Sequence, residues 1–200
     1  MADGTAIVTS QDGLSFDAET HTYRVNGMVV PSVTQVLRSV GLAIEPYSPN
    51  GEQAMERGAR VHLACLYDDD GDILESEFTE EELGYLAGWR KFKEETRWVS
   101  LSREKPFYSE RGYCGTPDAI GSFPNQGVAV LDIKTGTFER WHKLQRAAYT
   151  DFRLCFLRVG VYLTSEGNYT IREDPIIERR RDLDIFLAAL AIHNWKENTK

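Results

Sequence analysis

The feature that most constrains the fold is a short apolar run, residues 128–131, that leads directly into Asp132-Ile133-Lys134. The run is made of Val, Ala, Val and Leu, which is typical of a buried β-strand. Because successive side chains of a strand point to opposite faces of a sheet, Asp132 and Lys134 are predicted to share one face. The chain must therefore fold so that two charged side chains stand at the end of a buried strand.

Other strands are predicted around this one from their β-branched and aromatic residues and from the turn residues between them. Together the predicted strands of the sheet cover residues 99–108, 113–123, 128–134, 159–164 and 169–172. Asp118 lies on the strand that precedes residues 128–134 in a predicted hairpin, so its carboxylate is expected to meet that of Asp132.

Helical spacing of apolar residues predicts helices on both sides of this strand region. They cover residues 52–67, 79–97, 139–157 and 178–198, with a shorter helix capped by Ser32 and Gln35 and ended by Gly41. Residues 14–30 are predicted to form a small antiparallel element with a tight turn at Asn26-Gly27, and residues 44–51 a loop.

The order helix, three strands, helix, strand predicts an α/β fold with a mixed central β-sheet flanked by helices. We expect one domain over residues 1–200, in which residues 1–50 form an N-terminal β-hairpin and helix embellishment. The chain contains no run of 18 apolar residues, and Met1-Ala2-Asp3-Gly4 does not resemble the start of a signal peptide. An intracellular protein without a membrane partner is therefore expected.

The net charge of −8 does not favour a nucleic-acid partner, because phosphate contacts require basic surface. The acids are unevenly distributed, however. Residues 66–82 contain nine acids and no Lys or Arg, which leaves 22 acids against 23 Lys and Arg in the rest of the chain. Local basic surface is therefore compatible with the sequence. The acidic run is interpreted as a solvated loop and helix start, with a DNA-mimicking or partner-binding surface as the alternative.

The three cysteines, Cys65, Cys114 and Cys155, are far apart and odd in number. This spacing argues against a disulfide framework and against a metal site made of cysteines alone. We interpret them as reduced, mostly buried thiols.

Asp118, Asp132 and Lys134 together indicate a particular chemistry. Clustered carboxylates repel one another, and a hard divalent cation cancels that repulsion. Mg²⁺ suits oxygen ligands and the phosphate of a substrate, and a lysine beside them can orient or deprotonate an attacking water. This is the equipment for hydrolysis of a phosphodiester.

Asp118 followed by Asp132-Ile133-Lys134 also resembles the motif of the PD-(D/E)XK nuclease superfamily. Further segments resemble its RecB-like and phage-exonuclease branch, and the resemblance covers about residues 14–172. These segments are Gly58-Ala59-Arg60-Val61-His62 (Gly-x-x-x-His), Lys134-Thr135-Gly136 (Lys-Thr-Gly), Gln145 with Tyr149 (Gln-x-x-x-Tyr), and the phage-like start His21-Thr22-Tyr23, Asn26-Gly27 and Pro31-Ser32-Val33-Thr34.

The resemblance implies a restriction-endonuclease-like core and a metal-dependent DNA nuclease, of the phage-exonuclease type used in DNA recombination, repair or degradation. It implies one or two Mg²⁺ or Mn²⁺ ions and no iron–sulfur cluster, since that cluster needs four cysteines. The implied partners are DNA and a single-strand-annealing or recombinase protein.

The implied roles of the residues follow from their places in the motifs. Asp118, Asp132, His62 and the backbone carbonyl of Ile133 would be the metal ligands, and Lys134 would position the attacking water. Gln145 and Tyr149 would support the site or touch the DNA backbone, and Glu104 would add an outer-shell carboxylate. Apart from these motifs, Arg140, Lys143 and Arg146 together with Trp141 suggest a basic, aromatic edge for phosphate and base contact, and Arg60 is a further candidate for DNA contact.

Each of these residues also has a plainer interpretation. His62 alone is compatible with a core histidine, Asp132 and Lys134 with an ion pair at a strand end, and Tyr149 with core packing. Glu104 and Gln145 are compatible with solvated side chains, as are the basic residues near Trp141.

Two further functional hypotheses stay open at this point. One is an endonuclease or nickase of the same fold, acting on branched or single-stranded DNA. The other is a catalytically silent relative that binds DNA or a protein.

Overall fold

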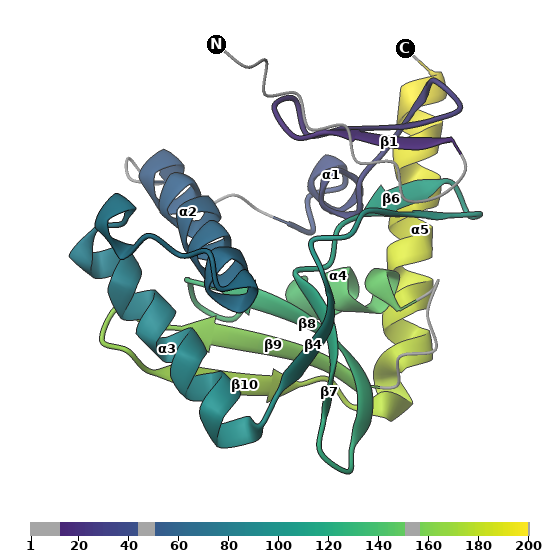
Figure 1. The fold of residues 1–200 in the computed structure, drawn as a ribbon. Coiled ribbons are helices and arrows are strands. Elements are labelled where there is room, and N and C mark those ends of the chain that lie inside the picture. The colour runs from purple at the N-terminus through teal and green to yellow at the C-terminus, as the bar shows by residue number, and fades with distance from the viewer. Residues whose placement is uncertain (1–12, 44–50, 151–156, 200) are drawn as a thin grey trace.

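A central five-stranded sheet organises the computed structural model, which describes residues 13–43, 51–150 and 157–199 (Figure 1). The order of its strands is β10-β9-β8-β7-β4. Strands β8 and β9 pair in parallel, and the other pairs are antiparallel. The strands are β4 (Val99–Arg103), β7 (Ala119–Phe123), β8 (Gly127–Lys134), β9 (Leu157–Leu163) and β10 (Tyr169–Glu173).

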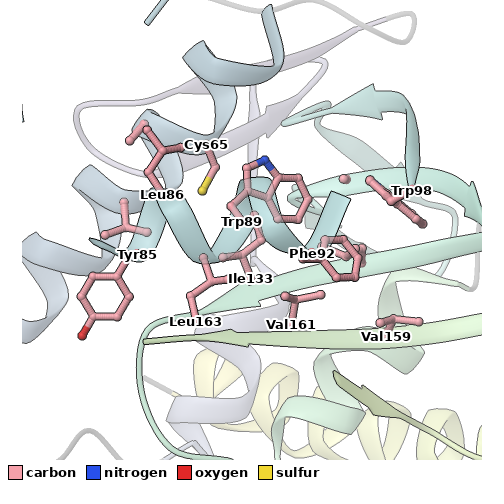
Figure 2. Close-up of a cluster of buried hydrophobic side chains, with 14 of the residues drawn as sticks. Cys65, Tyr85, Leu86, Trp89, Phe92, Trp98, Ile133, Val159, Val161 and Leu163 are labelled. Carbon is pink, nitrogen blue, oxygen red and sulfur yellow. The ribbon is translucent and has the colours of Figure 1, made fainter. Parts of the chain in front are cut away.

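Helices cover both faces of this sheet, each over its own hydrophobic core. The long helices are α2 (Gly51–Asp70), α3 (Glu80–Thr96), α4 (His142–Tyr149) and α5 (Arg179–Asn198), with short 3₁₀ turns at Glu75–Glu77 and Ile176–Glu178. Figure 2 shows the core under α2 and α3, where Trp89 and Phe92 lie beside Ile133. The predicted α/β fold, with a mixed sheet flanked by helices, is therefore confirmed.

The alternation of side chains along β8 connects both cores. Ala129, Leu131 and Ile133 point into the core under α2 and α3, whereas Val130 points into the core under α4 and α5. Asp132 and Lys134 continue the side of Val130, as the period of two requires. The predicted sharing of one face by Asp132 and Lys134 is confirmed.

The N-terminal part folds as a separate three-stranded antiparallel sheet of β1 (Leu14–Asp17), β2 (Thr22–Val25) and β3 (Met28–Val30). Asn26 (φ 51°) and Gly27 (φ 82°) take the left-handed conformation that a two-residue hairpin turn requires. Helix α1 (Val33–Ser39) follows with the predicted capping box, in which the side chains of Ser32 and Gln35 each accept a backbone N–H. The predicted embellishment is therefore a three-stranded sheet and a helix.

The predictions of single strands over residues 99–108 and 113–123 are wrong. Each breaks in two, and the inner halves, β5 (Phe107–Ser109) and β6 (Tyr113–Gly115), form a two-stranded sheet of their own. Pro106 and Pro117 lie in the breaks and cannot donate to a ladder. Glu104 adds a left-handed turn there, with φ 43°.

The acidic segment after residue 67 also differs from the prediction. Asp68, Asp69 and Asp70 are the last turn of α2 and not a solvated loop. They remain helical because cations of α3 lie against them: Lys93 Nζ is 3.0 Å from Asp68 and 2.5 Å from Asp69, and Arg90 is 2.7 Å from Asp68.

The helix predicted over residues 139–157 begins only at His142. Residues 151–156, with Cys155, lie outside the described part of the chain, and Leu157 already belongs to β9. Most of the loop predicted at 44–51 lies outside it too. Cys65 and Cys114 are buried free thiols. No helix in the described ranges has the length and apolar character needed to cross a membrane.

Candidate metal centre and cleft

The site is built around the main chain of Ile133, at the end of the β7–β8 ladder. The β7–β8 ladder ends at the pair of Ala119 with Leu131, so Ile133 has no strand partner on that side. Its N–H donates instead to Asp118 Oδ2 at 2.5 Å, and its carbonyl lies 2.9 Å from Nε2 of His62. The backbone of β8 thereby fixes the carboxylate of Asp118 and the imidazole of His62 at one point.

His62 and Asp118 also form an ion pair, with 3.3 Å between Nδ1 and Oδ1. Burial disfavours the charged imidazole, but the charge and hydrogen bond of Asp118 outweigh it and raise the pKa of His62 to about 9. Burial likewise disfavours the ionised carboxyl of Asp118, yet the charge of His62 holds its pKa below the ordinary value. Without a cation, the pair is imidazolium and carboxylate at neutral pH.

Glu104 completes a compact group of ligand atoms. Among the described residues, one ligand atom each from His62, Glu104 and Asp118 lie within 4.8 Å of one another. Burial, followed by the charge of Asp118, raises the pKa of Glu104 to about 8. The shift reflects the repulsion between neighbouring buried carboxylates, which a bound cation would relieve. Carboxylate and carbonyl ligands suit Mg²⁺ or Mn²⁺, and an imidazole is accepted more readily by Mn²⁺ than by Mg²⁺.

Asp132 lies next to this group but its carboxylate is directed elsewhere. It is 1% exposed, with Lys134 Nζ at 2.8 Å from Oδ1 and Arg146 at 3.5 Å from Oδ2. Burial raises the pKa of Asp132, and the charges of Lys134 and Arg146 oppose that rise. The structure therefore pairs Asp132 with Lys134, whereas the sequence led us to expect it among the metal ligands.

Arg146 corrects one of the predicted DNA contacts. Its side chain is 0% exposed, so it has no surface to offer to a DNA backbone. The guanidinium binds both carboxylate oxygens of Asp174, at 2.8 and 2.9 Å, and faces Asp132 from the same position. The reason is that the residue lies on the inner side of α4, against Gly160 of β9.

The other predicted DNA contacts remain at the surface. Arg140 is exposed. Lys143 is partly exposed and pairs with Glu178 at 3.1 Å. Arg60 is also partly exposed, but its guanidinium binds Glu82, the third residue of α3 and a member of its capping box, at 2.5 Å.

Gln145 and Tyr149 meet as the four-residue spacing on one helix requires. Nε2 of Gln145 donates to the hydroxyl of Tyr149 at 3.0 Å. The ring of Tyr149 makes a T-shaped contact with Phe107, with 6.0 Å between centroids. It also packs on Gly115, where an added Cβ would lie 2.7 Å from Cε1 of Tyr149. The amide of Gln145 is 7% exposed, and its Oε1 has no hydrogen-bond partner among the described residues.

These residues line a cleft with two lobes. The cleft lies between the main sheet on one side and the N-terminal sheet with helix α1 on the other. The lobe of about 610 Å³, called the Asp118 lobe, also contains Glu104, Asp132 and Tyr149. The lobe of about 1180 Å³, called the Trp141 lobe, lies between α2 and the start of α4. Both lobes share the side chains of His21, Thr34, Arg38, Met55, His62, Lys134 and Gln145. His62 and Lys134 therefore lie where the two lobes meet, with Glu104 and Asp118 on the side of the Asp118 lobe.

Sequence reasoning missed one group in the cleft, His142. Its Nδ1 lies 2.9 Å from the hydroxyl of Tyr162, and burial lowers its pKa to about 3. The imidazole is therefore neutral and belongs to an aromatic cluster with Trp141 and Phe138. Asp174, the partner of Arg146, was missed as well, since nothing local in the sequence connects positions 28 residues apart.

Comparisons with known proteins add little to this picture. No family model matches the chain, and no curated protein matches it. Among solved structures, the crystal structure of SSO0001 matches with a TM-score of 0.32 and 16% sequence identity, over 78% of this chain and 83% of that one. At this TM-score the likeness carries no argument about the fold or the activity.

Proposed function

We propose that this protein is a divalent-metal-dependent nuclease that hydrolyses phosphodiester bonds in DNA, with a restriction-endonuclease-like core and the character of a phage-type exonuclease. The observation that carries the proposal is the convergence of His62, Glu104 and Asp118 within 4.8 Å, at the end of the strand that presents Lys134. Buried carboxylates, an imidazole and a lysine in one cleft are costly to assemble unless a cation and an anionic substrate bind there.

The cation would be held by side chains of His62, Glu104 and Asp118, together with the carbonyl of Ile133 that His62 now contacts. Mg²⁺ or Mn²⁺ bound there would polarise the scissile phosphate and stabilise the charge that develops on it. His62 must give up its proton to become a ligand, since a metal binds only the neutral imidazole. Asp132 supports the site from behind, by holding Lys134.

Lys134 would hold the attacking water and bring positive charge to the phosphate. Its ammonium lies 2.8 Å from Asp132 Oδ1, which fixes its direction from the sheet into the cleft. Gln145 and Tyr149 would bear on the substrate from α4, since both line the Asp118 lobe. DNA would then occupy both lobes, with the scissile phosphate where they meet.

The test is cleavage of end-labelled linear duplex and of closed circular DNA, with Mg²⁺, Mn²⁺ or EDTA. We expect metal-dependent loss of linear DNA, abolished by Asp118→Ala and by Lys134→Ala in proteins that keep the wild-type circular dichroism. Metal-dependent cutting of circles as well would replace the exonuclease with an endonuclease or nickase. Activity that survives in Asp118→Ala would refute the assigned site. No cleavage of any substrate, with metal still bound, would favour the silent binding relative.

A further inference from the structure

We infer that the Trp141 lobe takes an unpaired nucleobase, stacked on the indole of Trp141, so that the strand being cut is single-stranded in the cleft. The inference rests on the proposed function and names the form of its substrate. It specifies the base contact expected of Trp141 as stacking of an unpaired base next to the cut, and it makes no change to the assignment of the group of ligand atoms.

Trp141 has the surroundings of a stacking platform. The side chain is partly exposed, lines the lobe, and makes a T-shaped contact with the ring of His142, with 4.3 Å between centroids. The exposed apolar side chains of Leu42 and Met55 line the same lobe. Aromatic rings in such grooves bind bases by stacking, whatever the base.

The distance to Lys134 connects this platform with the chemistry. The ammonium lies 5.9 Å from the centroid of the Trp141 ring. A nucleotide whose base contacts that ring would therefore bring its phosphate close to Lys134 and to the group of ligand atoms. The base on Trp141 is then a neighbour of the scissile phosphate.

Gly58 indicates that the lobe is kept open. It lies inside helix α2, where glycine is unfavourable because it loses more backbone freedom on folding than other residues. No close contact with another described residue explains it: the nearest described atom to an added Cβ would be Oγ1 of Thr135 at 3.5 Å, an ordinary contact. The missing side chain instead leaves space on the α2 wall of the lobe.

Gln145 indicates independently that a polar ligand enters. Its amide is more than nine-tenths buried, lines both lobes, and keeps one polar atom without a partner among the described residues, while the other bonds Tyr149. A buried amide atom without a partner is unfavourable. The edge or backbone of a bound nucleotide would supply the missing hydrogen bond.

These features favour a single strand over an intact duplex. A base stacks on the face of an aromatic side chain in the wall of a cleft only when it is free of its own pair and stack. The same lobe would accept the frayed end of a duplex after unpairing.

The first experiment measures binding and does not need cleavage. In a Trp195→Phe background, the fluorescence of Trp141 is the main response to a ligand, because Trp89 and Trp98 are buried. A single-stranded oligodeoxynucleotide, added in EDTA or with Ca²⁺, should quench the fluorescence in a saturable way, and a blunt duplex should quench it much less. Trp141→Phe should abolish the change. Equal quenching by duplex and single strand, or quenching that persists in Trp141→Phe, would overturn the inference.

The second experiment places a single abasic nucleotide at each position along a labelled strand. In the wild type, one position next to the cut should slow cleavage by about 5- to 150-fold, the range expected for one lost stacking contact. Trp141→Ala should be slower on the intact strand by a similar factor and show no further loss at that position. Trp141→Phe should recover most of the rate. Trp195→Ala, a change on the exposed face of α5, is the matched control.

The outcomes separate this inference from the proposed function. If no DNA is cut but quenching requires Trp141, the proposed nuclease activity is wrong and the inferred binding of a base in the Trp141 lobe is retained. If DNA is cut and abasic positions act equally in the wild type and Trp141→Ala, the nuclease stands and the stacking site is wrong.

Discussion

At the scale of single residues, two of the proposed metal ligands have pKa values above their ordinary values. His62 and Glu104, with pKa values raised to about 9 and about 8, both carry a proton at neutral pH. Each must lose it to bind a metal, so binding should release protons below these pKa values. The direction follows: the affinity for metal should rise with pH up to about 8 to 9 and then level off.

We therefore predict that the affinity for Mn²⁺ increases between pH 6.5 and 8 by up to about tenfold per pH unit for each proton released. Isothermal titration calorimetry in buffers of different ionisation enthalpy measures both the affinity and the protons released. Glu104→Gln should lower the number of protons by about one. An affinity that does not change over this range would contradict the assignment of these two ligands.

Arg146 is predicted to be a structural requirement. Its guanidinium is the counter-charge of two buried carboxylates, Asp132 and Asp174. Arg146→Met leaves both without it, and breaking a buried pair of this kind costs about 3–5 kcal/mol of stability. Urea unfolding checks the value. Arg180→Met is the control, because the Arg180–Asp184 pair is largely exposed and should change stability by less than about 1 kcal/mol. An Arg146→Met variant as stable as the wild type would show that the ion pairs of Arg146 with Asp132 and Asp174 are not needed for stability.

The sequence predicted some of these residues and missed the roles of others for a physical reason. Asp132 and Lys134 were placed on one face by the period of a strand alone. Glu104 was given only an outer role, because its position depends on a left-handed turn that no local pattern indicated. Arg146 was assigned to the surface, because the helix period does not say which side of α4 faces Asp174.

At the scale of elements, α3 lies against the turn between β9 and β10, and two helix-interior glycines allow this. A Cβ on Gly84 would lie 1.8 Å from the carbonyl oxygen of Ser165, and one on Gly88 would lie 2.6 Å from that of Asn168. These backbone atoms cannot move as a flexible side chain does. The close approach of helix and turn therefore requires glycine at both positions.

We predict that Gly84→Ala destabilises the protein by about 1–3 kcal/mol, the usual cost of overpacking, although alanine is the better helix former. Gly58→Ala is the matched control in α2. Its added methyl would make only an ordinary contact, so it should stabilise by roughly 0.5–1 kcal/mol. Thermal unfolding of both variants makes the comparison. If Gly84→Ala were as stable as Gly58→Ala, the close approach of α3 to the turn between β9 and β10 would be contradicted.

The elements themselves followed from the sequence where local signals were strong. The capping boxes of α1 and α3 place Ser32 and Thr79 at the helix starts, as their side chains dictate. The β-rich composition of residues 99–123 predicts strands that are too long, because Pro106 and Pro117 interrupt them. The sequence predicts too early an end for α2, because the cations that stabilise Asp68 and Asp69 lie on another helix.

At the scale of the whole molecule, much of the acidic charge is used inside the fold. Arg90, Lys93 and Arg103 neutralise the acids at the end of α2 and tie α2 to α3 and β4. The net charge of −8 is therefore a poor guide to the surface that meets a substrate. The cleft takes its functional side chains from both faces of the sheet: His62 comes from α2 on one side, and Lys134 points to the other.

The group of ligand atoms connects α2, β8 and the segment before β7, so a bound cation should stabilise the whole fold. Binding to the folded state alone adds about 2.7 kcal/mol at 100 times Kd, which is roughly 5–11 °C in Tm for a chain of this size. We expect this rise with Mn²⁺, its reversal by EDTA, and its loss in Asp118→Asn. Asp184→Asn, an exposed acid on α5, should keep the full rise. An equal rise in both variants would mean that the cation binds elsewhere, because only Asp118 belongs to the proposed ligand group.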